Sequence, residues 1–241
     1  MAPAGIGHRV EGLHAVSAAI AAGRVRTLHA EVRRSGVADV VTKARAAGIE
    51  VRPSDDVRDR AETTAPQGVV ADCTPIPLVS VGDLAVAGLP ALLVLDHVQD
   101  PQNLGAIARS ALAAGITGLV VSSDRAAPFS AAAFKAAVGA LERLPVAGVR
   151  SVADGLKRLS KAGVWTVGLD AGGSESLFGL GLLTEPVAVV VGAEGAGLGR
   201  LVRERCDVVA SIPMSGPTES LNASVAAALA SFEVARVRSG S

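Results

Sequence analysis

The fold of this chain is indicated by residues 187–199, which read VAVVVGAEGAGLG. The five apolar residues at 187–191 suit a strand of a parallel sheet that is covered on both faces. The glycines that follow would let the backbone approach a ligand closely. Open α/β sheets bind ligands at the carboxyl ends of their strands. The stretch therefore predicts an α/β fold with a ligand site after this strand.

Two further polar clusters follow apolar runs in the same way. The first holds Asn103, Gly105 and Arg109. The second begins with Ile212, Pro213 and Met214 and continues with Ser220, Leu221, Asn222 and Ser224. Because the carboxyl ends of parallel strands meet at one edge of a sheet, the three clusters predict one composite site. Their polarity favours a polar cofactor and a substrate with a hydroxyl or phosphate group.

Apolar runs alternate with helical patterns over residues 91–237. Strands are expected at 91–95, 118–122, 145–149, 164–169, 187–191 and 208–212, and helices at 104–114, 131–138, 152–162, 198–205 and 221–237. This alternation predicts a mostly parallel sheet covered on both faces. In the last helix, one apolar stripe holds Leu221, Val225, Leu229 and Phe232.

The first part of the chain, residues 1–72, has the pattern of a small αβ domain. Helices are expected at 13–22 and 37–47, the second ending at Gly48, and strands at 27–32, 49–51 and 68–71. Residues 73–90 are rich in Pro, Gly and Val, which predicts a linker lying partly against one of the domains. Residues 91–241 would then form the second, larger domain.

Composition limits the function classes. The formal net charge is zero, which argues against coating nucleic acid by bulk charge but leaves a local basic face possible. Aromatic residues are 2% of the chain, so a surface that stacks bases on rings is disfavoured. The chain shows no transmembrane run and no signal peptide, and Cys73 and Cys206 match no metal or redox spacing. A cytoplasmic protein without a metal site or membrane partner is expected.

Each polar cluster also has a purely structural interpretation. Asn103 fits a helix N-cap, and Arg109 would then be an exposed helical residue. These two residues are six apart, so they converge only if Asn103 lies at the cap. Glu194 fits the first turn of a helix, where the helix dipole favours a carboxylate. A capping role at Thr218 or Ser220 explains part of the third cluster.

The glycine pattern at 192–199 excludes a P-loop, which requires G-x-x-x-x-G-K-[ST]. It also disfavours a dinucleotide fingerprint, because G-x-G-x-x-G is absent from the first strand–helix turn. Glu194 would in addition repel a pyrophosphate. A nicotinamide-dependent Rossmann enzyme remains an alternative from another enzyme class.

Together, the clusters resemble motifs 1, 2 and 3 of the SpoU (TrmH) family of RNA ribose 2′-O-methyltransferases, in the SPOUT superfamily. Motif 1, N-x-G-x-x-x-R, matches Asn103, Gly105 and Arg109. Motif 2, G-x-E-G-x-G, matches Gly192, Glu194, Gly195 and Gly197, and motif 3 matches Ile212–Met214 and Ser220–Ala226. Residues 12–16, 67–69 and 139–146 resemble the branch that methylates guanosine in 23S rRNA.

The resemblance implies a homodimer with a C-terminal trefoil knot, S-adenosyl-L-methionine (SAM) as methyl donor, and an RNA substrate that is most simply 23S rRNA. The catalytic residues it implies are Arg109, Asn103, Glu194, Ser220 and Asn222. The SAM-binding residues it implies are Gly192, Gly195, Gly197, Ile212, Met214, Leu221 and Ser224. Arg109 would either take the proton of the ribose 2′-hydroxyl or hold the phosphate and stabilise the developing alkoxide.

Three alternatives stay open within this resemblance. An antibiotic-resistance rRNA 2′-O-methyltransferase and a tRNA 2′-O-methyltransferase would use the same chemistry on another nucleotide. An RNA-binding assembly factor would no longer methylate, although the intact set of motif residues argues against it.

Overall fold

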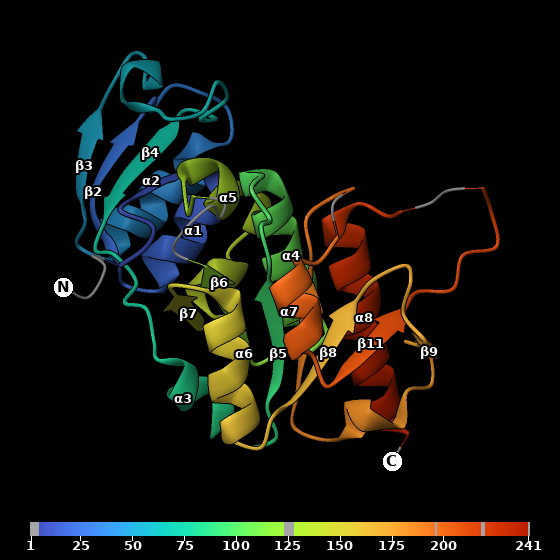
Figure 1. The fold of residues 1–241 in the computed structure, drawn as a ribbon. Coiled ribbons are helices and arrows are strands. Elements are labelled where there is room, and N and C mark those ends of the chain that lie inside the picture. The colour runs from blue at the N-terminus through green and yellow to red at the C-terminus, as the bar shows by residue number, and fades with distance from the viewer. Residues whose placement is uncertain (1–4, 123–127, 196, 218–219, 241) are drawn as a thin grey trace.

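The computed structural model describes residues 5–122, 128–195, 197–217 and 220–240. Within these residues the larger sheet has seven strands, all parallel, in the order β7-β6-β5-β10-β8-β11-β9 (Figure 1). The strands are β5 (Ala91–Leu95), β6 (Gly118–Ser122), β7 (Val146–Val149), β8 (Trp165–Leu169), β9 (Glu175–Ser176), β10 (Val187–Val191) and β11 (Val208–Ser211). The predicted α/β fold with a mostly parallel sheet is confirmed.

Helices cover both faces of this sheet, as the apolar strands require. On one face lie α4 (Pro101–Ala113) and α8 (Ala223–Ser239), with α5 (Ala131–Ala137) against α4, and on the other lie α6 (Val152–Lys161) and α7 (Arg200–Arg205). Leu93 and Val189 point into the first face, whereas Leu92 and Val190 point into the second. Burial of both faces explains why these strands are continuous apolar runs rather than alternating ones.

The strand order brings the predicted clusters to one edge. β10 follows β8 in the chain but lies between β5 and β8 in the sheet. The carboxyl ends of β5, β8, β10 and β11 are therefore neighbours, and the loops after them share one side of the molecule (Figure 1). The trefoil knot implied by the resemblance stays a prediction.

The small N-terminal domain has a mixed sheet with strand order β1-β4-β2-β3. Its elements are β1 (Arg9–Glu11), α1 (Leu13–Ala21), β2 (Val25–Ala30), α2 (Val37–Ala46), β3 (Glu50–Pro53), the 3₁₀ turn η1 (Arg58–Arg60) and β4 (Val69–Cys73). β2 and β3 are parallel, and the other pairs are antiparallel. β1 was not predicted, because its three residues are too few to show a period.

Residues 73–90 are more ordered than the expected linker. They contain α3 (Val81–Ala85), which begins with a capping box between Ser80 and Asp83. Val81 and Leu84 are buried in the apolar cluster on the α6 side of the large sheet. A five-residue helix shows no clear period, but the S-x-x-D pattern at its start was a visible signal. Its second half thus lies against the larger domain, whereas Ile76 pairs with Ile6 of the small domain.

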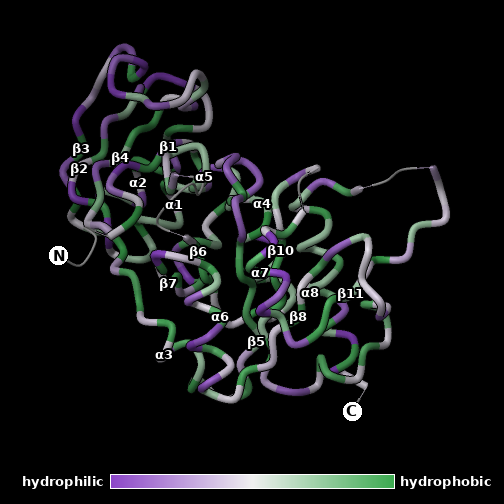
Figure 2. The backbone as a smooth tube through the Cα atoms, viewed as in Figure 1, coloured by the Kyte–Doolittle hydropathy of each residue, from purple (hydrophilic) through white to green (hydrophobic). Residues whose placement is uncertain are grey.

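The two domains share one apolar core. Its buried residues include Val16 of α1 and, from the larger domain, Phe134 of α5 and Leu141 of the 3₁₀ turn η2 (Ala140–Glu142). A Cβ added to Gly7 would lie 2.3 Å from the Phe134 ring, so the domains meet without a gap there. Figure 2 shows hydrophobic segments through the central strands and more hydrophilic loops at the top of the small domain. A last 3₁₀ turn, η3 (Gly181–Thr184), precedes β10.

None of the helices in the described part of the chain is long and apolar enough to cross a membrane.

Candidate active site

Three of the predicted catalytic side chains form one hydrogen-bonded cluster. The Asn103 Nδ2 group donates to Glu194 Oε1 at 2.9 Å, and the Asn222 Nδ2 group donates to Asn103 Oδ1 at 3.1 Å. Asn222 also donates to Glu194 Oε1, and the Ala223 backbone N–H does so at 3.4 Å. The cluster joins α4, the loop after β10 and the start of α8. Side chains that are far apart in the sequence thus converge at the carboxyl edge of the sheet.

Asn222 has a second role as the N-cap of α8. Its Oδ1 atom accepts hydrogen bonds from the Ser224 backbone N–H at 2.8 Å and from the Ser224 hydroxyl at 2.6 Å. The expected cap at Ser220 is therefore wrong, and Thr218 lies outside the described residues. Because Nδ2 and Oδ1 of Asn222 are both engaged, the side chain holds one orientation. Ser224 supports that orientation.

Asn103 is not a helix N-cap, contrary to expectation. The helix begins at Pro101, and the carboxylate of Asp100 caps it by accepting from the Gln102 N–H at 2.9 Å. Asp is a strong N-cap, and Pro is favoured at the first helical position, so together they set the start of α4. Asn103 lies in the first turn instead, where its side chain is free to bind Glu194.

The loop after β10 folds back on itself and presents Glu194. Ala193 and Gly197 exchange two backbone hydrogen bonds, at 3.2 and 2.9 Å. A Cβ on Gly192 would lie 2.2 Å from the Gly197 carbonyl oxygen, so only glycine fits at Gly192. Gly197 has a φ of 63°. Glu194 precedes α7 by six residues, so its expected place in a first helical turn is wrong.

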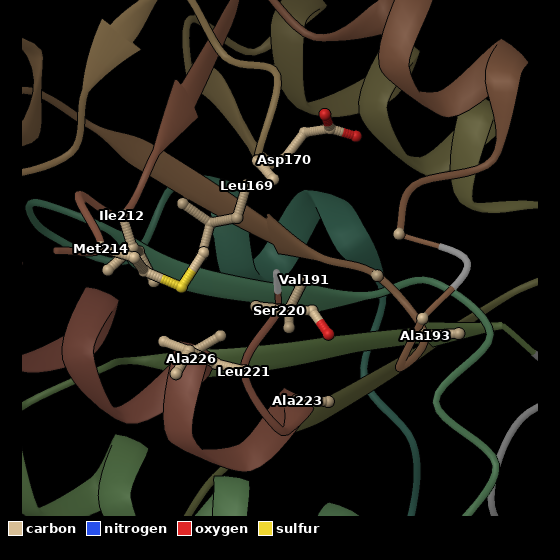
Figure 3. A pocket seen from close by; sticks show the side chains of 14 residues that line it. Leu169, Asp170, Val191, Ala193, Ile212, Met214, Ser220, Leu221, Ala223 and Ala226 are labelled. Atoms are coloured by element: carbon tan, nitrogen blue, oxygen red, sulfur yellow. The ribbon is translucent and has the colours of Figure 1, made fainter. Parts of the chain in front are cut away.

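A cavity of about 280 Å³ opens beside this loop (Figure 3). It lies at the ends of β8, β10 and β11 and against the start of α8. Six of the seven predicted cofactor residues line it: Gly192, Gly195, Gly197, Ile212, Met214 and Leu221. Ser220, one of the predicted catalytic residues, lines it as well. Ser224 does not line it. The walls are mostly apolar side chains and glycine backbone, which suits a small organic ligand.

One wall of the cavity was not predicted from the sequence. It is formed by Leu169, Asp170 and Ala171 at and after the end of β8. The Asp170 carboxylate accepts from the Gly172 N–H at 2.9 Å and from Arg203 Nη1 at 2.8 Å. The signal for this wall was present, because the strand predicted at 164–169 ends there. The carboxyl-end rule applied to this strand would have found Asp170.

Arg109 lies apart from the other predicted catalytic residues. It is exposed on α4, does not line the cavity, and has no hydrogen bond or ion pair to any residue that the structure describes. Gly105, one turn earlier, packs on α5, where a Cβ would lie 2.4 Å from the Ala133 carbonyl oxygen. Residues i and i+4 share a helix face, so Arg109 faces the α5 side, away from Asn103. A single chain does not bring Arg109 to the cluster.

Both cysteines of the chain are poor nucleophiles. Burial raises the pKa of the Cys206 thiol to about 12 and that of the Cys73 thiol to about 11. A thiol with so high a pKa stays protonated near neutral pH, and the thiolate is the reactive form. Neither cysteine lines the cavity.

The predicted apolar stripe of α8 faces outward. Val225, Leu229 and Phe232 are 46%, 36% and 53% exposed, although each is a large apolar side chain. Leu221, at the head of the stripe, turns to the cavity. Contiguous apolar exposure on one helix face is typical of an interaction surface.

Comparison with known proteins places the chain in a family. The model of the SpoU rRNA Methylase family matches residues 90–232, and that of RNA 2'-O ribose methyltransferase substrate binding matches residues 9–79. The "23S rRNA (guanosine-2'-O-)-methyltransferase RlmB" of Xylella fastidiosa is 43% identical over 213 residues, covering 86% of this chain and 85% of that protein.

Two further relatives agree. An "Uncharacterized tRNA/rRNA methyltransferase" of Mycobacterium marinum is 44% identical over 204 residues, covering 82% of this chain but 66% of that protein, so the chain spans about two thirds of the length of this relative. The crystal structure of the SpoU methyltransferase AviRb from Streptomyces viridochromogenes, in complex with the cofactor AdoMet, superposes with a TM-score of 0.82 at 31% identity, covering 95% of this chain and 89% of that one. The chain belongs to the SpoU rRNA methylase family.

Proposed function

We propose that this chain is a SAM-dependent RNA ribose 2′-O-methyltransferase. The observation that carries the proposal is the Asn103–Glu194–Asn222 cluster beside a cavity built by the glycine loop after β10. The RNA 2'-O ribose methyltransferase substrate-binding match at residues 9–79 supports it, as does the AdoMet in the AviRb structure. SAM is the same molecule as AdoMet.

The cavity fits SAM in its chemistry. SAM supplies a methyl group on a sulfonium sulfur, together with an adenosine that needs an apolar slot and hydrogen bonds from backbone groups. Ile212, Met214 and Leu221 provide apolar walls, and the backbone at Gly192, Gly195 and Gly197 lies open to the cavity. The absence of a side chain at Gly192 lets this loop close, because a Cβ there would overlap the Gly197 carbonyl group. Ser224 would act indirectly, by holding Asn222.

The chain's own residues would prepare the ribose. Asn103 and Asn222 fix the Glu194 carboxylate in one orientation, and the Ser220 side chain lies at the cavity wall (Figure 3). Arg109 would hold the RNA phosphate and stabilise the developing alkoxide, because guanidinium groups stay protonated and bind phosphate in two-pronged fashion. Since Arg109 lies apart from its own cluster, it would serve the cluster of a second copy.

The substrate is proposed to be 23S rRNA, modified at a guanosine ribose. The 43% identical Xylella fastidiosa protein carries that name, and both chains are covered almost throughout. The test is methyl transfer from labelled SAM to unmodified 23S rRNA, 16S rRNA and tRNA, followed by mapping of alkali-resistant positions. We expect one labelled ribose in 23S rRNA. Label in tRNA alone would show that the substrate is tRNA rather than 23S rRNA. Absence of SAM binding would refute the proposed SAM-dependent activity.

The glycine loop gives a first prediction. Gly192→Ala is expected to weaken SAM binding by about 10- to 100-fold, because the new methyl overlaps the Gly197 carbonyl and overpacking of this kind costs about 1–3 kcal/mol. Gly216→Ala is the control: Gly216 does not line the cavity, and a Cβ there meets no atom within 4 Å. It should therefore leave SAM binding unchanged. Calorimetric titration with SAM measures both, and equal losses would contradict the packing argument.

The exposed face of α8 gives a second prediction, about the homodimer. We propose that Val225, Leu229 and Phe232 pack against the same residues of a second copy, as a two-fold interface allows. Burying an exposed Phe contributes about 1.5–3 kcal/mol, so Phe232→Asp should raise the dimer dissociation constant at least about tenfold. Val86→Asp is the control, because Val86 is also an exposed apolar side chain but lies at the end of α3, which packs on the α6 side of the sheet. Sedimentation equilibrium measures the dissociation constant. A constant unchanged by Phe232→Asp would show that this face of α8 is not the dimer interface.

A further inference from the structure

We propose that a notch at the top of the small domain binds one unpaired nucleotide of the RNA substrate, with Arg33 on its phosphate. The notch is defined by residues 31–34, after β2, and residues 53–55, at the end of β3, and it encloses about 540 Å³. β2 and β3 are parallel neighbours, so the notch lies where their carboxyl ends meet. The inference rests on the proposed function and names which face of the small domain would read the RNA.

The walls of the notch are tied together by Glu31. Its carboxylate accepts from the Val57 backbone N–H at 3.2 Å and from Arg34 Nη1 at 3.0 Å, so it joins the segment after β3 to the loop after β2. The Ser54 N–H donates to the Ala30 carbonyl at 2.9 Å, which extends the pairing of the two strands. Because the backbone of these walls is already fixed, less ordering is needed when a ligand binds.

The groups around the notch match the parts of a nucleotide. Arg33 is exposed and makes no ion pair within the described residues, so its five N–H donors are available for a phosphate. The exposed Asp55 carboxylate can accept from a base amino group or a ribose hydroxyl. Val32, also exposed, offers apolar contact to a sugar or base face. Recognition here would use phosphate, ribose and base edges, in keeping with the scarcity of aromatic residues.

The position of the notch relates it to the methyl-transfer site. Figure 1 shows the loops after β2 and β3 on the same, upper side of the molecule as the loops after β10 and β11. The Arg24–Glu142 ion pair, with both side chains largely buried, links the two domains in addition to their shared apolar core. A nucleotide in the notch would therefore sit at a fixed separation from the Asn103–Glu194–Asn222 cluster. That separation would decide which ribose reaches the site.

The test compares Arg33→Gln with Arg45→Gln in the full chain. Arg45 is an exposed arginine on α2 of the same domain that does not line the notch, so it is the matched control. Both variants are assayed for methyl transfer to 23S rRNA and for filter binding of the same RNA across a range of salt. We expect Arg33→Gln to raise the RNA KM about tenfold and to reduce the slope of log binding constant against log salt by about one. The kcat and the SAM KM should not change, and Arg45→Gln should resemble wild type.

The proposal that the notch binds a nucleotide would be overturned if both variants had the same RNA KM and salt slope. It would also be overturned if Arg33→Gln lowered kcat and left the RNA KM unchanged. A wild-type protein that methylates no RNA would instead refute the proposed function. In that case filter binding still tests the notch: weaker RNA binding by Arg33→Gln alone supports it, and equal binding by both variants overturns it.

Discussion

Arg109→Ala is expected to lower the rate of methyl transfer on the order of 100-fold or more, about 2.7 kcal/mol of transition-state stabilisation. The physical reason is the loss of the cation proposed to bind the RNA phosphate and the developing alkoxide. Arg109 is exposed and makes no bond to the described residues, so its removal should leave thermal stability and SAM affinity unchanged. Single-turnover assays with labelled SAM measure the rate, and calorimetry measures SAM binding.

Arg158→Ala is the matched control for this result. Arg158 is an exposed arginine on α6, which covers the other face of the sheet, so its loss should not change the rate. A similar fall in both variants would show a general loss of positive charge rather than a role at the site. A normal rate for Arg109→Ala would remove Arg109 from the mechanism.

In the proposed homodimer, a mixed dimer can show which copy's cluster Arg109 serves. An Arg109→Ala chain is paired with a Glu194→Gln chain, and each parent homodimer should be nearly inactive. If Arg109 acts on the partner's cluster, one of the two sites in the mixed dimer has both residues intact, and about half of the wild-type activity per dimer returns. If Arg109 acts within its own chain, every site carries one defect and no activity returns. The second outcome would contradict the proposed arrangement.

Much of the fold followed from the sequence because the central strands are buried on both faces. β5 and β10 are runs of five apolar residues, and both were predicted with the bounds that the structure has. The elements that were missed are short: β1 has three residues, α3 has five and β9 has two. Their positions are set by pairing and packing with distant segments, which a local pattern does not record.

The candidate site was predictable in its members more than in its geometry. Asn103, Glu194 and Asn222 were named from the sequence, but their mutual hydrogen bonds depend on β10 entering the sheet between β5 and β8. The Asn103 cap was wrong because Asp100 and Pro101 compete better for the start of the helix. The separation of Arg109 from Asn103 follows from their six-residue spacing once Asn103 is not the cap, and the packing of Gly105 against α5 fixes the face that Arg109 occupies.

The ion pair between the domains should dominate their docking. The Arg24 guanidinium donates to both oxygens of Glu142 at 2.6 Å, and the two side chains are 11% and 4% exposed. Arg24 also binds the Gly7 and Thr74 carbonyls and lies 5.5 Å from the centre of the Phe134 ring. Removing one partner of such a pair leaves a buried charge, so Arg24→Ala or Glu142→Ala should each lower the free energy of unfolding by about 3–5 kcal/mol.

The double variant separates the interaction between Arg24 and Glu142 from the packing contacts that each side chain makes by itself. Removing both charges leaves no buried ion, so Arg24→Ala with Glu142→Ala should destabilise the chain by clearly less than the sum of the single changes. Arg9→Ala is the control, since the Arg9–Asp72 pair is 38% and 40% exposed and such pairs contribute about 0–1 kcal/mol. Urea unfolding measures all four variants. Additive single effects below about 1 kcal/mol would mean that apolar contacts such as Gly7 against Phe134 hold the domains. The distance between the proposed methyl-transfer site and the small domain would then be set by apolar packing rather than by the Arg24–Glu142 ion pair.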